Sequence, residues 1–211
     1  MIMQPPPGER PPTLPRWAKW IAAPIMWAFG WKYGGGLPNI PKMVIIGVPH
    51  TTNWDGFWYL VITAYMRLRT NVIMKAEIAR TPFVGWVFKK FGGIPVERST
   101  SNNLVTQMAA EIAKRETIAI VIAPEGTRKR AEYWHAGFYW IAHRAHIPIV
   151  LAAIDYSIKS LNFLATIQTT GDIDADFRVI ASLYEGHLNG KRPENIGPIR
   201  PKPGKVHKET E

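Results

Sequence analysis

The sequence predicts an α/β domain with a mixed, mostly parallel sheet that is covered by helices on both faces. Apolar runs of strand length alternate along the chain with segments of helical periodicity, which is the order expected of this fold class. The run at 44–48 is continuously apolar, and the run at 117–123 is apolar after Thr117, as in strands that are buried on both faces. With 211 residues, 46% of them hydrophobic, the chain can form one domain with a substantial core.

The N-terminal segment 16–31 is predicted to lie at a membrane interface. It follows a Pro-rich start, and it contains Trp17, Trp20, Trp27 and Trp31. Its apolar stretch, interrupted by Pro24, is too short to cross a hydrocarbon layer of about 30 Å, and no small-residue cleavage site follows that would indicate a secretory signal. Trp prefers the headgroup level, where Arg16 and Lys19 can meet anionic lipid. An ordinary core helix is the alternative.

The remaining elements follow from periodicity and from turn residues. We expect strands at 44–48, 72–74, 94–96, 117–123 and 147–154, and a further short strand at 167–170. We expect helices at 56–68, 82–91, 103–115 and 136–145, and one more after Asp176. The predicted organisation is a start and interfacial segment over 1–41, a domain over 42–190 and a basic tail over 191–211.

The charge of the chain points to an anionic partner. Lys and Arg number 26 against 16 Asp and Glu, which gives a net charge of +10. Nucleic acid, an anionic lipid surface or a phosphorylated substrate would each suit this balance, although single lysines are more often simply solvated. The chain has no cysteine, which excludes disulfides, a thiolate nucleophile and cysteine-ligated metals.

The motif His50-Thr-Thr-Asn-Trp-Asp55 is the main candidate for chemistry. A histidine with a carboxylate in reach is a general base with an orienting partner. The two side chains can meet only if the chain turns between them, and Thr51, Thr52 and Asn53 favour a turn followed by a helix N-terminus. His50 would then lie at the carboxyl edge of the sheet, where α/β folds bind ligands. The alternative is a loop histidine beside a helix-capping Asp.

A second cluster, Glu125-Gly126-Thr127-Arg128, follows the strongest predicted strand. A glycine-hinged group of this composition is suited to holding an anion. The alternative is that Glu125 and Arg128, three residues apart, simply pair on one helical turn.

Four blocks in this order resemble those of the glycerolipid acyltransferases, a family that includes the lysophosphatidic acid acyltransferases. The blocks are His50-Thr-Thr-Asn-Trp-Asp55, Gly93-Ile-Pro-Val-Glu-Arg98, Pro124-Glu-Gly-Thr-Arg128 and Ile147-Pro-Ile-Val150. The resemblance covers roughly residues 42–155. It implies a glycerol-3-phosphate acyltransferase-like α/β fold and the transfer of a fatty acyl group from a thioester to a glycerol hydroxyl.

The resemblance also implies roles for individual residues. His50 resembles the base of the family, and Asp55 resembles its orienting partner. Arg98 corresponds to an arginine associated with the acceptor phosphate, and Lys75 resembles a basic position between the first two blocks. The acceptor-binding block corresponds to Glu125, Gly126, Thr127 and Arg128. For Arg98, a surface ion pair with Glu97 or another acid is the alternative.

The expected chemistry requires no cofactor and no metal. A thioester donor, acyl-CoA or acyl-ACP, would be a co-substrate, and the nucleophile would come from a lipid acceptor, most simply lysophosphatidic acid. We expect backbone N–H groups of the loop after His50 to stabilise the oxyanion. The enzyme would be peripheral on the membrane, at an anionic surface of the cytoplasmic face.

Several alternatives stay open at this stage. The acceptor could be another hydroxylated amphiphile without a phosphate. In a different class, a basic nucleic-acid-binding or lipid-binding protein without catalysis would explain the charge, but no nucleic-acid-binding motif is recognisable, and nucleic acid is not an expected partner. His143 and His146 have helical spacing, so they could also be a metal pair. The sequence carries no signal for the oligomeric state.

Overall fold

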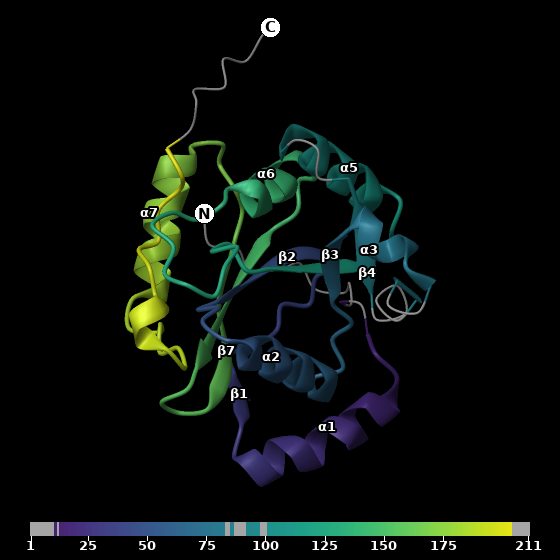
Figure 1. Ribbon diagram of the computed structural model, residues 1–211, viewed down its shortest axis with the longest axis vertical. Helices are drawn as coiled ribbons and strands as arrows, with labels where there is room; N and C mark the ends of the chain where they lie inside the picture. The colour runs from purple at the N-terminus through teal and green to yellow at the C-terminus, as the bar shows by residue number, and fades with distance from the viewer. Residues whose placement is uncertain (1–10, 12, 83–84, 87–91, 98–100, 204–211) are drawn as a thin grey trace, which may run out of the picture.

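The computed structural model describes residues 11, 13–82, 85–86, 92–97 and 101–203 (Figure 1). The described strands are β1 (Lys32–Gly34), β2 (Lys42–Val48), β3 (Asn71–Lys75), β4 (Gly93–Val96), β5 (Ile118–Ile122), β6 (Ile149–Asp155) and β7 (Ser160–Ile167). The described helices are α1 (Arg16–Phe29), α2 (Asn53–Tyr65), α3 (Ala76–Arg80), α5 (Ser101–Ala113), α6 (Gly137–Arg144), α7 (Ile173–Tyr184) and the short 3-10 helix η1 (Pro193–Asn195).

The seven strands form one sheet in the order β1-β7-β6-β2-β5-β3-β4. Five of the six neighbouring pairs are parallel, and β6 with β7 is the antiparallel pair. In the centre of the sheet, Ile45 of β2 lies opposite Val121 of β5 and Val150 of β6. The predicted fold class, a mixed and mostly parallel sheet, is confirmed.

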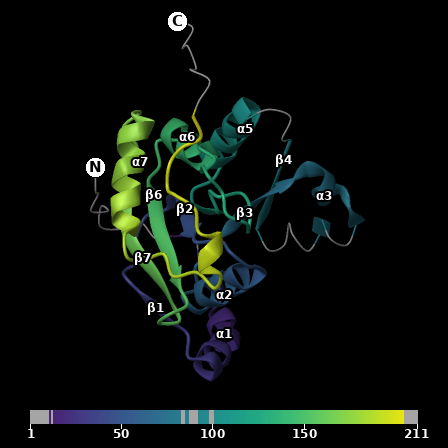
Figure 2. The same ribbon diagram turned by 60° about the vertical axis from the view of Figure 1, so that its left-hand side comes forward.

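The sheet divides the core into two layers. Val44, Ile46 and Val48 of β2 face the side that is covered by α5, α6 and α7. Met43 and Ile45 face the opposite side, which is covered by α1 and α2. This alternation follows from the two-residue period of a strand. Figures 1 and 2 show the two helical layers on opposite faces of the sheet, as the sequence predicts.

The observed elements correspond to local signals in the sequence. All seven residues of β6 are buried, as its continuous apolar run predicts. The turn before β4 depends on Gly92, whose φ of +89° lies in the region that L side chains rarely adopt. A Cβ atom there would also lie 2.5 Å from the carbonyl oxygen of Thr70.

Two predicted element boundaries in the C-terminal third are wrong. Of the strand expected at 167–170, only Ile167 lies in a strand, as the last residue of β7, which begins at Ser160 and pairs with β6. The helix expected after Asp176 already begins at Ile173, because the side chain of Asp172 accepts a hydrogen bond from the N–H of Ala175 and caps the helix. The strand β1 was not predicted. The helix expected at 82–91 lies mostly outside the described residues.

The Trp-rich segment is a helix that continues through Pro24. Its buried side is formed by Ala18, Ala22 and Met26, and α1 packs against α2. Such packing compensates for the backbone hydrogen bond that a proline removes. None of the helices in the described part of the chain is long and apolar enough to cross a membrane.

The four tryptophans predicted at the membrane interface divide into two groups. Trp17, Trp20 and Trp27 are 56%, 75% and 86% exposed. Trp31 is only 6% exposed and stacks on Trp58 at a ring-centroid distance of 4.5 Å. The prediction is therefore wrong for Trp31, which belongs to the core because the chain turns back toward the sheet after Gly30.

Trp31→Ala should lower the free energy of unfolding by about 3–5 kcal/mol, because it removes a buried ring and leaves a cavity. Trp20→Ala should change this free energy by less than about 0.5 kcal/mol, since an exposed ring makes few contacts. Urea denaturation followed by circular dichroism measures both values. Equal effects of the two substitutions would contradict the assignment of Trp31 to the core.

Candidate active site

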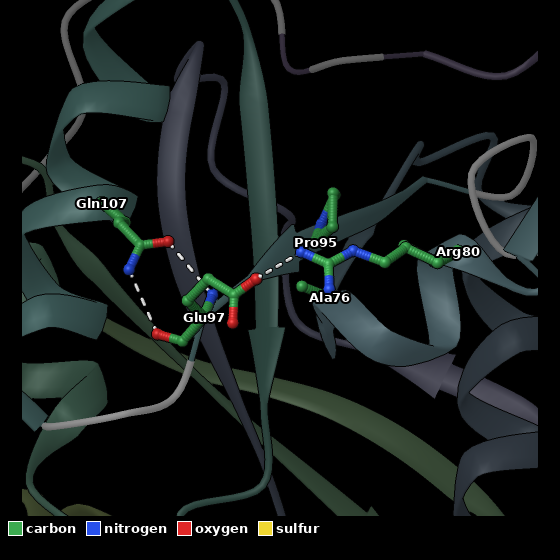
Figure 3. A pocket seen from close by; sticks show the side chains of 6 residues that line it. Ala76, Arg80, Pro95, Glu97 and Gln107 are labelled. Carbon is green, nitrogen blue, oxygen red and sulfur yellow. Dashed lines mark hydrogen bonds and ion pairs between the residues drawn. The ribbon is translucent and has the colours of Figure 1, made fainter.

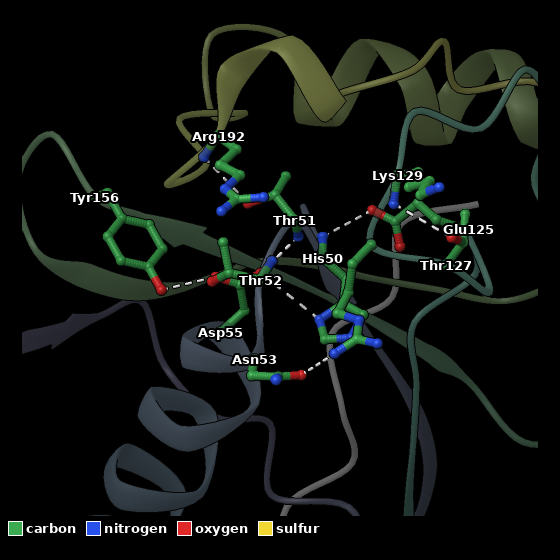
Figure 4. A network of polar contacts seen from close by, with 11 residues as sticks. His50, Thr51, Thr52, Asn53, Asp55, Glu125, Thr127, Lys129, Tyr156 and Arg192 are labelled. Carbon is green, nitrogen blue, oxygen red and sulfur yellow. Dashed lines mark hydrogen bonds and ion pairs between the residues drawn. The ribbon is translucent and has the colours of Figure 1, made fainter.

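Two predicted site residues, His50 and Glu125, and one residue that was not predicted, Tyr156, follow the carboxyl ends of three adjacent strands (Figure 4). His50 follows β2, Glu125 follows β5, and Tyr156 follows β6. Because β2 lies between β5 and β6 and the three strands are parallel, their carboxyl ends reach the same edge of the sheet. Open α/β sheets bind their ligands at this edge.

His50 and Asp55 are brought together by the turn that the sequence predicts. The Nδ1 atom of His50 lies 3.7 Å from Oδ2 of Asp55. Thr52 is the N-cap of α2, and Asp55 occupies the third position of that helix. The side chain of His50 is 30% exposed, whereas that of Asp55 is 4% exposed. The imidazole of His50 therefore opens to solvent, and the carboxylate of Asp55 lies beneath it.

The carboxylate of Asp55 is held by four hydrogen bonds. Its Oδ2 atom accepts from the backbone N–H groups of Thr51 (2.5 Å) and Thr52 (2.6 Å). Its Oδ1 atom accepts from the hydroxyl of Thr52 (3.0 Å) and from the phenol of Tyr156 (2.7 Å). Asp55 therefore does cap the helix, as the alternative interpretation of the motif held, and it lies beside His50 at the same time.

Glu125 fixes the backbone of the histidine. Its Oε1 atom accepts the backbone N–H of His50 at 3.0 Å. Its Oε2 atom is buried without a hydrogen-bond partner among the described residues. Burial raises the pKa of Glu125 to about 7, and the hydrogen bond from His50 opposes this rise. A large share of Glu125 is therefore protonated at neutral pH.

The pKa of His50 is lowered. Desolvation by burial is the main cause, and the positive charge of Arg128 acts in the same direction. The negative charge of Asp55 acts in the opposite direction. His50 is therefore neutral at physiological pH, as a general base must be.

The backbone N–H groups expected to stabilise an oxyanion are already occupied. The N–H of His50 donates to Glu125, and those of Thr51 and Thr52 donate to Asp55. These three groups are therefore not available to a substrate in this structure, and that expectation is wrong for them. The cause is the geometry of the turn, which directs its N–H groups toward the two carboxylates.

The second cluster forms a turn instead of a helix. Arg128 donates a hydrogen bond from Nη1 to the side-chain oxygen of Asn53, and Glu125 bonds to His50, so the two are not paired with each other. The hydroxyl of Thr127 accepts the N–H of Lys129 at 3.2 Å. Gly126 has a φ of +65°, and a Cβ atom there would lie 2.7 Å from the ring of His135. Glycine is therefore required at this position.

The side chains of two predicted cationic residues, Arg98 and Lys75, lie outside the described part of the chain. Arg98 lies outside the described residues. Lys75 is the last residue of β3, but its side chain is outside the described part. The neighbouring Glu97 forms an ion pair of 2.9 Å with Arg80. Figure 3 shows this pair at the wall of a cavity of about 520 Å³, at the carboxyl end of the adjacent strands β3 and β4.

The C-terminal segment contacts the loop between β2 and α2 (residues 49–52), which the sequence did not predict. The N–H of Arg192 donates to the hydroxyl of Thr51 at 3.3 Å. A Cβ atom on Gly190 would lie 2.9 Å from Pro49, so that this close approach requires glycine. The ammonium of Lys191 lies 4.9 Å from the ring centre of Trp54. In the sequence, a glycine beside basic residues near the C-terminus does not indicate contacts with a distant loop. A tyrosine at the end of a strand, such as Tyr156, does not indicate them either.

The described residues contain no group of three or more His, Asp or Glu side chains that could hold a metal ion. His143, one of the two histidines considered as a metal pair, has its Nδ1 atom 3.0 Å from the hydroxyl of Thr169. His146 follows α6 with a φ of 52°.

Comparison with known proteins identifies the family of this chain. The family model described as Acyltransferase matches residues 35–155, which is more than half of the chain. The crystal structure of PlsC, a 1-acyl-sn-glycerophosphate (LPA) acyltransferase from Thermotoga maritima, has a similar fold. Its TM-score is 0.56 at 13% sequence identity, over 81% of this chain and 77% of that one. No curated protein sequence is a significant match. The chain therefore belongs to the Acyltransferase family.

Proposed function

We propose that this acyltransferase moves a fatty acyl group from an acyl thioester to a hydroxyl of a lysophospholipid-like acceptor, with lysophosphatidic acid as the preferred acceptor. The observation that carries the proposal is the pairing of His50 with the buried Asp55 at the carboxyl edge of the sheet. The structural relative is itself an LPA acyltransferase, which supports the choice of acceptor.

His50 is the proposed general base. With Nδ1 on the side of Asp55, its Nε2 atom is left to take the proton of the acceptor hydroxyl. The hydroxyl oxygen attacks the thioester carbonyl and forms a tetrahedral intermediate. The intermediate collapses to the new ester and expels the thiolate, which takes the proton back from His50. Donor and acceptor supply every reacting atom, so acyl-CoA or acyl-ACP is a co-substrate and no cofactor or metal is needed.

Asp55 and Arg128 shift the pKa of the proposed base, His50, in opposite directions. The carboxylate of Asp55 stabilises the imidazolium that forms during the reaction, whereas burial and, to a smaller extent, Arg128 keep the resting imidazole neutral. The positive end of α2 begins at Asn53, directly after the loop. With the loop N–H groups occupied, this helix terminus and Arg128 are the proposed sources of oxyanion stabilisation.

The acceptor phosphate is assigned to cations around the base. Arg128 lies close enough to His50 to lower the pKa of its imidazole. Arg98, in the second sequence block, and Lys75, between the first two blocks, are assigned to the same task from the resemblance. A guanidinium can donate two parallel hydrogen bonds to a phosphate, which favours arginine for this role.

The helices α1 and α2 are proposed to dock on the membrane. Besides Trp17, Trp20 and Trp27 of α1, the side chains of Trp54, Phe57 and Leu60 of α2 are 52%, 40% and 58% exposed. These apolar groups belong to two helices in contact, and one of them, Trp54, lies within the catalytic motif. Together with the net charge of +10, they suit an anionic surface such as the cytoplasmic face. Docking there would bring lipid acceptors to His50.

His50→Ala and Asp55→Asn should each lower kcat by about 10²–10⁴-fold, because the proton acceptor or its partner is removed. The double variant should lose little more, since the two residues act as one unit. In the wild type, kcat/KM should fall with acidification, with a midpoint below pH 6.5, because the pKa of His50 is lowered from that value and its neutral form persists to lower pH. Transfer from palmitoyl-CoA to lysophosphatidic acid, measured against pH, provides these values.

The matched control for Asp55→Asn is Asp176→Asn. Asp176 also accepts a backbone N–H, from Thr170 at 2.8 Å, and a phenol, from Tyr139 at 2.8 Å. Its substitution should cost stability without a comparable loss of kcat. Near-normal turnover of a folded His50→Ala protein would overturn the mechanism, and an inactive protein that binds oligonucleotides at physiological salt would favour the nucleic-acid alternative.

Replacement of Arg98 by Lys should affect phosphate-bearing acceptors selectively. The planar guanidinium, which can donate two parallel hydrogen bonds to a phosphate, is replaced by a single ammonium group. The kcat/KM for lysophosphatidic acid should therefore fall about 10–100-fold. The loss with monoacylglycerol should be about threefold or less. Arg115→Lys, which alters an ion pair on the α5 side, is the control. Equal fractional losses on both acceptors would instead indicate an acceptor without a phosphate.

The double variant Trp20→Ala/Trp27→Ala should bind anionic liposomes at least about tenfold more weakly, because two exposed apolar rings no longer enter the interface. Co-sedimentation with phosphatidylglycerol vesicles measures the binding. Trp140→Ala removes a ring of 37% exposure from α6, on the opposite face of the sheet, and should have little effect. Unchanged binding of the double variant would exclude α1 as the docking element.

A further inference from the structure

Tyr156 is the one donor to Asp55, among those described, that does not come from the catalytic loop. Its phenol donates to Oδ1 of Asp55 at 2.7 Å across 101 residues of sequence, whereas the other donors belong to Thr51 and Thr52. Figure 4 shows the phenol on the side of the carboxylate away from His50. Tyr156 lies just beyond the stretch that matches the family model, which ends at residue 155.

The position of the Tyr156 side chain is fixed from two directions. Its backbone N–H donates to the carbonyl oxygen of Asn189 at 2.8 Å, within the C-terminal segment that also contacts Thr51. Its ring meets the ring of Trp31 edge to face at 5.2 Å, and Trp31 in turn stacks on Trp58. The phenol therefore reaches Asp55 from a rigid support of strand and stacked rings.

The hydroxyl of Tyr156 stays protonated wherever the enzyme functions. Burial raises its pKa above the usual value of 10.0, and the hydrogen bond to Asp55 raises it further. The phenol is thus a permanent donor to the carboxylate.

The orientation of the Asp55 carboxylate matters because its contact with His50 is long. The atoms Nδ1 and Oδ2 are 3.7 Å apart, so a small rotation of the carboxylate would weaken the interaction. The loop N–H groups hold Oδ2, and a bond to Oδ1 is needed to prevent rotation about the carboxylate axis. Tyr156 supplies the shorter of the two bonds to Oδ1.

We propose that Tyr156 is a positioning residue of this acyltransferase, which locks the carboxylate of Asp55 in the orientation that keeps Oδ2 toward His50. This role rests on the proposed function of the His50–Asp55 pair. Tyr156 does not touch the substrate. It acts through Asp55, and it connects the catalytic pair to the stack that Trp31 forms on Trp58 of α2.

Tyr156→Phe tests the role because it removes the hydroxyl and keeps the ring. We expect kcat to fall about 10–100-fold, with KM changed less than about twofold, since a hydrogen bond to a charged group is lost and the substrate contacts remain. The acid limb of kcat/KM should also move to lower pH. A carboxylate that rotates away raises the pKa of His50 less, so the imidazole protonates at lower pH.

Two comparisons distinguish positioning from a general structural effect. In the Asp55→Asn background, Tyr156→Phe should have almost no further effect on kcat. Tyr139→Phe is the matched control, because Tyr139 also donates to an aspartate, Asp176, at 2.8 Å. That pair adjoins Thr170, which follows β7 at the opposite edge of the sheet. Tyr139→Phe should lower the melting temperature without moving the pH profile.

A kcat within twofold of wild type for Tyr156→Phe would overturn the proposal. So would an unmoved acid limb, or an undiminished effect in the Asp55→Asn background. These results are distinct from a failure of the proposed function, in which His50→Ala and Asp55→Asn would themselves retain turnover. If those two variants are inactive and Tyr156→Phe is normal, only the positioning role is wrong.

Discussion

The site depends on the hydrogen bonds that the loop after β2 donates to Asp55. When the N–H groups of Thr51 and Thr52 converge on this carboxylate, they set the turn, begin α2 and bring His50 beside Asp55 in one step. A buried carboxylate requires such donors, because an unpaired charge in the interior is costly. Asp55, the proposed orienting partner of His50, is therefore also the group that shapes the backbone carrying His50. These two roles of Asp55 explain why a histidine and an aspartate five residues apart, a spacing that regular helices and strands do not bring together, can form a pair.

A second carboxylate, that of Glu125, also holds His50 in place. Glu125 accepts the backbone N–H of His50 from the end of the neighbouring strand, so His50 is held through its backbone by Glu125 and through its side chain by Asp55. Two carboxylates at one sheet edge repel each other when both are ionised, and Asp55 contributes to the raised pKa of Glu125. Near pH 7, the mostly buried Glu125 is protonated in part of the molecules, and this partial protonation limits the repulsion. The parallel order of β2 and β5 makes the arrangement possible.

The sequence predicted the buried centre of the sheet well and its edges poorly. The strands β2, β5 and β6 are almost entirely apolar, because both of their faces are covered, and a run of this kind is visible without a structure. The edge strand β1 has the sequence KYG and no such pattern. The boundaries of β7 were wrong because its sides alternate between buried and partly exposed. Trp31 was assigned to the interface with its three neighbours, since composition cannot tell which tryptophan follows the turn at Gly30 into the core.

By itself, the sequence determined the fold class, the family blocks and the pairing of His50 with Asp55, because these depend on local patterns or on residues within one turn. Only the tertiary structure decided which groups surround that pair. Glu125 reaches His50 across 75 positions and Tyr156 reaches Asp55 across 101, and both contacts exist because the strand order places β5 and β6 on either side of β2. Strand order is settled by the packing of whole elements in the core. No spacing between two residues in the sequence encodes it.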